Sequence, residues 1–516
     1  MRRVDHFTRG LSASWFATLV TVFYGLASVP LALSYLSVEE FGLFMLVQQV
    51  AGYFALIELG TSGATARILI DHKDNQSGKS YGSVITTGFL VLSIQGLIIM
   101  LLGLLGAPVV VHALGIPSSL QDTGVQLLRA LCVTFAVGTA FKIFGSILYA
   151  NKRLDFVNII IATSVLVGMA IMAVVLLMGG GLRGLIIVFA VQALLTIILQ
   201  ALACWRLRLF PMPGHWGKPS WTQFMEMFHF AKDVFLVNLG TQLLEGSQLI
   251  IVTRTMGLGA AAMWSVGTKV FGLLYQLLTR LEGTAIVFFA EMMVRGETSK
   301  LLMRFRQIYQ LTAGLAAVSL GVAAAINKPF VGWWADPALA WPLHLSVLMG
   351  AVVFLNLLTR CHIDLIIHTK RLLALRYIYF LEALAFVGMA FFLGSKMGLL
   401  GVIVASLSCM LIVRLGYSSW RISRYFGVAI INIVWTWIRR PLLAVALMGP
   451  FVFISPFWAG ITSTYGIGLL AVTIWMVVPA AIVLLYIALP RELAAELRQH
   501  LGDFVVSHLP RPRFFR

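Results

Sequence analysis

The sequence predicts an all-α polytopic membrane protein with about fourteen transmembrane helices, arranged as two six-helix pseudo-symmetric lobes and two C-terminal helices. Three observations predict this fold. Of the 516 residues, 60% are hydrophobic and 11% are charged, whereas about 25% of a soluble domain is charged. The apolar residues fall in long blocks, and parts of the first half recur in the second. This composition excludes a soluble enzyme, a nucleic-acid-binding factor and a disordered scaffold.

A membrane-spanning helix needs about 20 mostly apolar residues, and fourteen blocks meet this requirement. They cover residues 11–36, 41–70, 82–106, 123–149, 157–178, 184–207, 232–256, 259–290, 304–327, 341–367, 373–394, 397–420, 441–459 and 465–489. The first block follows a basic N-terminal segment but is longer than a signal-peptide core and has no convincing cleavage site. We therefore interpret it as an uncleaved first span.

The basic residues between the spans predict the orientation. If the N-terminus is cytoplasmic, 27 Lys and Arg residues lie in cytoplasmic segments and 3 in outer loops, namely Arg183, Lys328 and Lys396. Positive charge is retained on the cytoplasmic side of membranes. The sequence therefore predicts a multi-pass membrane protein with both termini cytoplasmic. The longer outer loops are expected at 107–122 and 328–340, the second with an aromatic Trp333-Trp334 pair.

Three local matches recur at nearly one offset. Residues 151–154 match 369–372, residues 181–185 match 398–402, and Gly60-Thr61 matches Gly283-Thr284. The offsets predict two lobes pointing the same way, related by an axis along the membrane normal. The expected parts are a first lobe (11–210), a cytoplasmic interfacial linker (211–231), a second lobe (232–424), spans 13 and 14 (441–489) and a basic amphipathic tail (490–516) on anionic inner-leaflet lipids.

Eight basic residues fall within the spans. They are Arg67, Arg129, Lys142, Arg254, Lys269, Arg280, Arg360 and Arg414. Each costs about 2.5–3.5 kcal/mol at a helix centre, so each needs a compensating role. Three lie near span ends, where snorkelling explains them as well as function does, namely Arg67, Arg254 and Arg414.

The deepest cations occupy matched positions, since Lys142 and Arg360 are 218 residues apart on the matched spans 4 and 10. Such a pair, facing a central cavity between the lobes, would clamp a diphosphate. Lys269 and Arg280 are 11 residues apart and return to nearly one helix face. The predicted substrate-binding residues are Lys142, Arg360, Lys269, Arg280, Arg129, Arg67 and Arg254.

Acidic residues within the spans offer the alternative of internal neutralisation. The candidates for counter-ions, or for ligands of a coupling Na⁺ or H⁺, are Glu58, Glu245, Asp364 and Glu282. Asp364 stands four residues after Arg360 and could pair with it on one helix face. No metal site and no further cofactor are expected. The four cysteines fall in apolar stretches without metal-like spacing and are interpreted as core residues.

Several stretches resemble the polysaccharide transporter family, the Wzx-type O-antigen flippases of the multidrug/oligosaccharidyl-lipid/polysaccharide (MOP) exporter superfamily. Leu36-Ser37-Val38-Glu39-Glu40-Phe41-Gly42-Leu43 is similar to the family's stretch between spans 1 and 2. Residues 58–64, together with Arg67, resemble the family's sequence at the end of span 2. The turns at 181–185 and 398–402 resemble the family's Gly-x-x-Gly turns. Ser37 and Glu58 depart from the commoner Gly and Asp. The resemblance covers essentially the whole chain.

This resemblance implies a MATE-like fold and a transporter that is not an enzyme. The implied activity is translocation of undecaprenyl-diphosphate-linked oligosaccharide, such as an O-antigen, capsule or exopolysaccharide repeat unit, from the inner to the outer leaflet by alternating access. Expected partners are this lipid-linked substrate and other assembly proteins such as a polymerase or a chain-length regulator, with no nucleic acid.

Other functions stay open at this point. A cation-coupled multidrug antiporter is the nearest alternative, but its cavity needs carboxylates, and the first span (11–36) contains no Asp or Glu. A membrane glycosyltransferase or polymerase needs catalytic acids on a large external loop, and the predicted outer loops are short. A major-facilitator transporter has a basic loop after span 2, whereas here that loop reads Asp71-His72-Lys73-Asp74-Asn75-Gln76.

Overall fold

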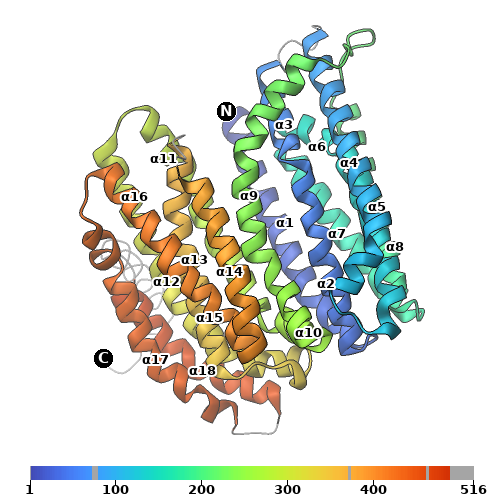
Figure 1. Cartoon of the computed structure of the whole chain (residues 1–516). Helices are drawn as coiled ribbons and strands as arrows, with labels where there is room; N and C mark the ends of the chain where they lie inside the picture. The colour runs from blue at the N-terminus through green and yellow to red at the C-terminus, as the bar shows by residue number, and fades with distance from the viewer. Residues whose placement is uncertain (1, 73–78, 370–373, 461–463, 489–516) are drawn as a thin grey trace, which may run out of the picture. The chain divides into compact units, whose positions relative to one another are not determined.

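The computed structural model describes residues 2–72, 79–369, 374–460 and 464–488, and every element in this part of the chain is helical (Figure 1). Twelve of the described helical segments are long and apolar enough to cross a membrane. Helices also cover the two remaining predicted spans, as α9 over 232–256 and as α10 with α11 over 259–290. The fourteen-span expectation is thus confirmed in outline. The tail at 490–516 lies outside the described residues.

By contacts, the chain forms two compact units. The first comprises residues 1–265 and 379–398, and the second comprises 266–378 and 399–516. This grouping places α9 with the first unit, where it packs on α2, α3 and α4. It differs from the boundaries of the two expected lobes, which stay a prediction.

In the first unit, spans 2 and 4 are broken and the other spans are continuous helices. The elements are α1 (Arg2–Leu33), α2 (Val38–Phe54), a 3₁₀ turn η1 (Ala55–Glu58), α3 (Thr61–His72), α4 (Lys79–Ala113), α5 (Ser118–Phe141), α6 (Ile143–Ala150), α7 (Leu154–Leu177), α8 (Gly181–Arg206) and α9 (Trp221–Met256). α14 (Leu375–Met397) joins this unit over most of its length, and α10 (Leu258–Gly267) crosses the boundary. α4 packs along α5, and α1 packs along α7.

The second unit is built around α12. Its elements are α11 (Lys269–Val294), α12 (Thr298–Trp334), η2 (Pro337–Leu339), α13 (Leu343–His368), α15 (Leu399–Cys409), a π-helical turn η3 (Met410–Leu415), α16 (Gly416–Phe426), η4 (Asn432–Thr436), α17 (Arg439–Ala459), α18 (Tyr465–Val483) and η5 (Leu484–Ala488). α12 packs against α11, α13, α17 and α18. The last two helices therefore cover one side of α12.

Two loop predictions need correction. α4 continues through Pro108 to Ala113, and α12 continues through Pro329 to Trp334, so both outer connections are shorter than 107–122 and 328–340. α9 already begins at Trp221, within the expected 211–231 linker. The loop before α9 docks on α4, where Ser83 donates a hydrogen bond to the Lys218 carbonyl at 2.7 Å.

The four cysteines are buried and free of disulfides, as their apolar surroundings predict.

Candidate functional site

Span 2 breaks directly after its acidic residue. η1 ends at Glu58, and the next two residues, Leu59 and Gly60, adopt positive φ angles of 54° and 76° before α3 begins at Thr61. A left-handed residue is costly for a side chain such as leucine, whereas glycine adopts this conformation readily. The break places the Glu58 carboxylate at the positive N-terminal end of α3, where a negative charge is stabilised.

Span 4 breaks at its basic residue. Lys142 stands between α5 and α6, and its amide donates to the Thr139 carbonyl instead of continuing the regular α-helical ladder. Its ammonium forms an ion pair with the Glu58 carboxylate. The Glu58 side chain is 8% exposed and the Lys142 side chain 46% exposed. The acid is therefore buried behind the pair, and the cation presents its outer side.

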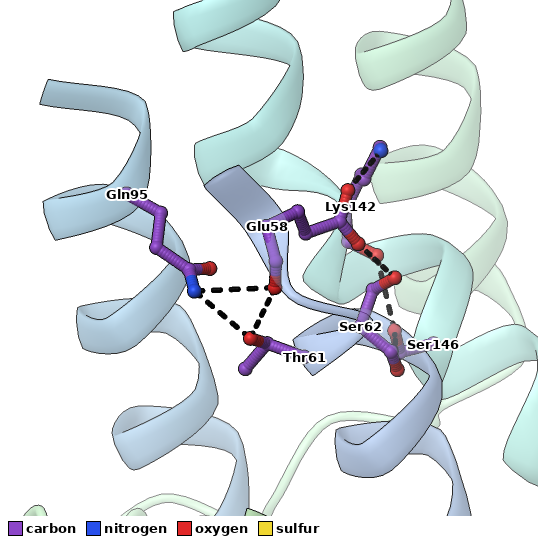
Figure 2. A network of polar contacts seen from close by, with 6 residues as sticks. All are labelled: Glu58, Thr61, Ser62, Gln95, Lys142 and Ser146. Atoms are coloured by element: carbon purple, nitrogen blue, oxygen red, sulfur yellow. Dashed lines mark hydrogen bonds and ion pairs between the residues drawn. The ribbon is translucent and has the colours of Figure 1, made fainter. Parts of the chain in front are cut away.

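A hydrogen-bond network surrounds Glu58 (Figure 2). The hydroxyl of Ser62 donates to the second carboxylate oxygen, while Thr61 and Gln95 donate to the Glu58 backbone carbonyl. The Gln95 amide also donates to the Thr61 hydroxyl at 2.9 Å, and Ser146 on α6 donates to the Ser62 carbonyl at 3.0 Å. The network thus connects the breaks of spans 2 and 4 to each other and to α4.

An apolar cavity of about 560 Å³ adjoins this network in the first unit. Thr61 and Gln95 line one part of it. Aliphatic side chains around η1 and aromatic or aliphatic side chains of α4 and α9 line the rest, among them Ile98, Phe224 and Phe228. Such a wall suits hydrocarbon, because it offers few hydrogen-bonding groups.

In the second unit, the matched cation also has a resident acid. Arg360 on α13 lies 3.5 Å from the Asp364 carboxylate and donates to the Tyr275 hydroxyl of α11 at 3.0 Å. The Arg360 side chain is 43% exposed. The pairing with Asp364 expected from their spacing is present in the structure.

The two halves that match in sequence also share a type of side-chain contact. Glu58 on span 2 contacts span 4 through Lys142, and Glu282 on span 8 contacts span 10 through Cys361, whose thiol donates to Glu282 at 2.9 Å. In each unit, therefore, a buried acid on one segment touches the segment that carries the deep cation.

The other predicted site residues stand elsewhere on their helices. Arg67 pairs with Asp71 at 3.1 Å, and Arg129 donates to the Leu104 carbonyl at 3.0 Å. Arg254 and Glu245 are exposed on α9. Arg280 is exposed on α11, and Lys269, half-buried, begins α11 at the break of span 8.

The break beside Lys269 has a dedicated partner that sequence reasoning missed. Asn327 of α12 is fully buried and donates to the Gly267 carbonyl at 3.1 Å and to Ser346 at 3.0 Å. Because a helix break frees carbonyl groups, a buried amide is a suitable partner.

Arg414 also differs from one sequence-based interpretation. It was compatible with snorkelling, but it is 5% exposed within the π-helical turn η3 and donates to the Asn356 side chain at 3.0 Å. Its position within the apolar block 397–420 gives no signal of this turn, since π-helical turns have no distinct sequence pattern.

Within the described residues no group of three or more His, Cys, Asp or Glu side chains has the arrangement of a metal site.

Comparison with known proteins places this chain by family and by fold. Residues 34–332 match the family model described as "Polysaccharide biosynthesis protein". No curated protein matches the sequence. Several solved structures are similar. An inward-facing multidrug resistance MATE family transporter of the MOP superfamily has a TM-score of 0.68 and 13% identity, over 81% of this chain and 98% of that chain.

The lipid II flippase MurJ, in an inward closed conformation, has a TM-score of 0.67 and 12% identity, over 92% of this chain and 98% of that chain. A MOP superfamily transporter from Pyrococcus furiosus, described as having a reverse polarity of its binding pocket, has a TM-score of 0.58 and 14% identity, over 81% and 95%. At such identities the likeness is one of fold. The chain belongs to the polysaccharide biosynthesis protein family and has the multi-pass membrane fold of MOP superfamily transporters.

Proposed function

We propose that this protein is a flippase that moves an undecaprenyl-diphosphate-linked oligosaccharide from the inner to the outer leaflet of the bacterial inner membrane by alternating access. The observation that carries the proposal is the pair of repeat-equivalent cations, Lys142 and Arg360, set within membrane-spanning segments of a polysaccharide biosynthesis protein. A diphosphate is the charged part of such a lipid, and ammonium and guanidinium groups are its usual protein partners.

The exposure of the Lys142 and Arg360 side chains supports an anionic cargo. Both cations keep an acid on one side and present much of the side chain on the other, with exposed fractions of 46% and 43%. A fully neutralised structural pair would have no reason to leave the cation exposed within a span, where charge is expensive. The remaining predicted cations, Lys269, Arg280, Arg129, Arg67 and Arg254, would then lie along the route of the anionic head group.

The pairing of the membrane-embedded acid Glu58 also favours this function over that of a multidrug antiporter. The similarity to a MATE transporter is one of fold, so it does not distinguish a flippase from an antiporter. A cavity for cationic drugs needs free carboxylates, whereas Glu58 is buried and ion-paired. If the chain were such an antiporter, drug efflux would depend on Glu58 or Glu245.

Reconstitution tests the proposal. The purified full-length chain is placed in liposomes that contain a fluorescent polyprenyl-diphosphate oligosaccharide in both leaflets, and an impermeant quencher is added outside. Flipping raises the quenched fraction from about half toward all. The same glycan on a polyprenyl alcohol without the diphosphate serves as control and should not flip. Quenching that stays at half with active protein, or efflux of a cationic dye in its place, would refute the flippase.

A further inference from the structure

A second group of buried polar side chains lies in the second unit, on the packed helices α11, α12 and α13. Four polar atoms in it have no hydrogen-bond partner within the described part of the chain, namely Glu282 Oε2, Tyr309 Oη, Thr312 Oγ1 and His362 Nε2. All four side chains are at least nine-tenths buried. Native proteins leave few such atoms unpartnered, so a group of them calls for a physical explanation.

Direct contacts tie Tyr309 to His362 and Glu282 to Cys361. The rings of Tyr309 and His362 stack with centroids 4.9 Å apart and planes inclined by 8°. Cys361, the neighbour of His362, donates its thiol to Glu282 Oε1 at 2.9 Å. Tyr309 also lies near Glu282 and Cys361. The residues come from α11, α12 and α13, so the group is formed only by the packed unit.

The charges around Glu282 do not neutralise it. The titratable and charged side chains near it on the packed helices are Tyr309, Arg360, Cys361, His362 and Asp364. The only strongly basic one among these, Arg360, is occupied by Asp364 and Tyr275. No cation lies within ion-pair distance of Glu282 in the described residues. An ionised carboxylate buried in this way costs several kcal/mol, which protonation removes.

The two carboxyl oxygens differ in the way a protonated acid requires. Oε1 accepts a hydrogen bond from Cys361, as the carbonyl oxygen of a carboxylic acid does, whereas Oε2 has no donor. His362 is engaged through Nδ1 by the Ser418 hydroxyl at 3.1 Å and keeps Nε2 open. Glu282 Oε2 and His362 Nε2 are thus both without a hydrogen-bond partner in the described residues.

We propose that Glu282, with Cys361, Tyr309 and His362 around it, forms a buried proton-binding site in the second unit, with the proton held on Glu282 Oε2. The site binds and releases a hydron without any other reactant, as the carboxylic acid and its carboxylate. It is separate from the Glu58–Lys142 pair, in which the acid has a cationic partner.

Infrared difference spectroscopy of the full-length protein in lipid, at neutral pH, tests the site without any transport assay. The wild type should show a protonated-carboxyl band that Glu282→Gln removes. Glu226→Gln, an exposed acid of α9, should leave the spectrum unchanged. Cys361→Ala keeps the proton but removes the donor to Oε1, so the same band should move to higher wavenumber. This second variant still tests the site if Glu282→Gln fails to fold.

Two results would overturn the site. One is a spectrum in which neither variant alters a protonated-carboxyl band. The other is binding of radioactive sodium that Glu282→Gln abolishes, because the carboxylate would then hold a metal ion.

A role of this proton in transport rests on the proposed flippase function. In the liposome assay, an imposed pH difference should change the rate of flipping in the wild type and not in Glu282→Gln. Unaltered flipping in both, together with the carboxyl band, would refute coupling while the site and the flippase stand. Absence of flipping in the wild type would refute the flippase alone.

Discussion

The ammonium of Lys142 is paired with the carboxylate of Glu58, 84 residues earlier, at the place where two membrane-spanning segments both break. Discontinuous spanning helices often carry the binding sites of transporters, because the break frees backbone and side-chain groups within the membrane. In this chain both members of the pair stand at such breaks. The pair is thus held by the backbone geometry of both segments.

Removing a deep cation should cripple export of surface polysaccharide. Lys142→Ala, Arg360→Ala and Lys269→Ala should each reduce export at least tenfold, because each deletes a positive charge that is expensive to keep in a span. Lys300→Ala, which breaks an exposed pair with Glu297, is the matched control. Membrane insertion is checked by fractionation. Export at the wild-type level in all three variants would contradict a cationic route.

Neutralising the resident acid should have the opposite effect on anion binding. Glu58→Gln keeps the shape of the side chain but frees the Lys142 ammonium, so inorganic diphosphate should bind about fivefold more tightly, equivalent to about 1 kcal/mol. Titration calorimetry of the purified chain measures this affinity. Glu291→Gln, the partner of the exposed Arg295, should leave it unchanged. Weaker binding in Glu58→Gln would instead indicate that the acid only positions the lysine.

The break after Glu58 should depend on one glycine. Gly60→Ala should lower the free energy of unfolding by about 1–2 kcal/mol, because φ is +76° and a Cβ is unfavourable there. No atom lies within 4 Å of the added Cβ, so the cost is conformational. Gly63→Ala, equally open but helical, should be neutral or stabilising by about 0.5–1 kcal/mol. Thermal unfolding compares the two. Equal melting temperatures would argue against the left-handed turn.

The break before Lys269 should depend on packing. Gly267→Ala would place its Cβ 2.2 Å from the ring of the fully buried Trp341. Overpacking of this kind costs about 1–3 kcal/mol, so the melting temperature should fall. Gly272→Ala on α11 meets open space and serves as its control. A variant as stable as the wild type would show that Trp341 can move aside.

The orientation can be read with cysteine labelling. Ser119→Cys and Lys218→Cys place thiols at exposed positions, predicted to be outer and cytoplasmic respectively. An impermeant maleimide should label intact spheroplasts only at position 119, and position 218 only after permeabilisation. The four buried native cysteines should stay unlabelled in both. Labelling of 218 in intact cells would reverse the proposed topology.

Much of the architecture depends on residues close together in the sequence and could therefore be predicted from the sequence. The length of each apolar block decides where a helix can cross a membrane, and the blocks over 441–459 and 465–489 correspond closely to α17 and α18 with η5. The i, i+4 spacing of Arg360 and Asp364 likewise predicts their contact, since both residues stand on one helix.

The sequence alone determined a multi-pass helical protein with a repeat, two deep cations at matched positions and a set of acids able to neutralise them. Only the tertiary structure decided which acid meets which cation. Glu58 joins Lys142 rather than Arg67 of its own span, and Glu282 meets Cys361 rather than Arg360. The physical reason is that these contacts join segments far apart in the chain, at breaks set by backbone conformation, which hydropathy and charge counts along one segment do not encode.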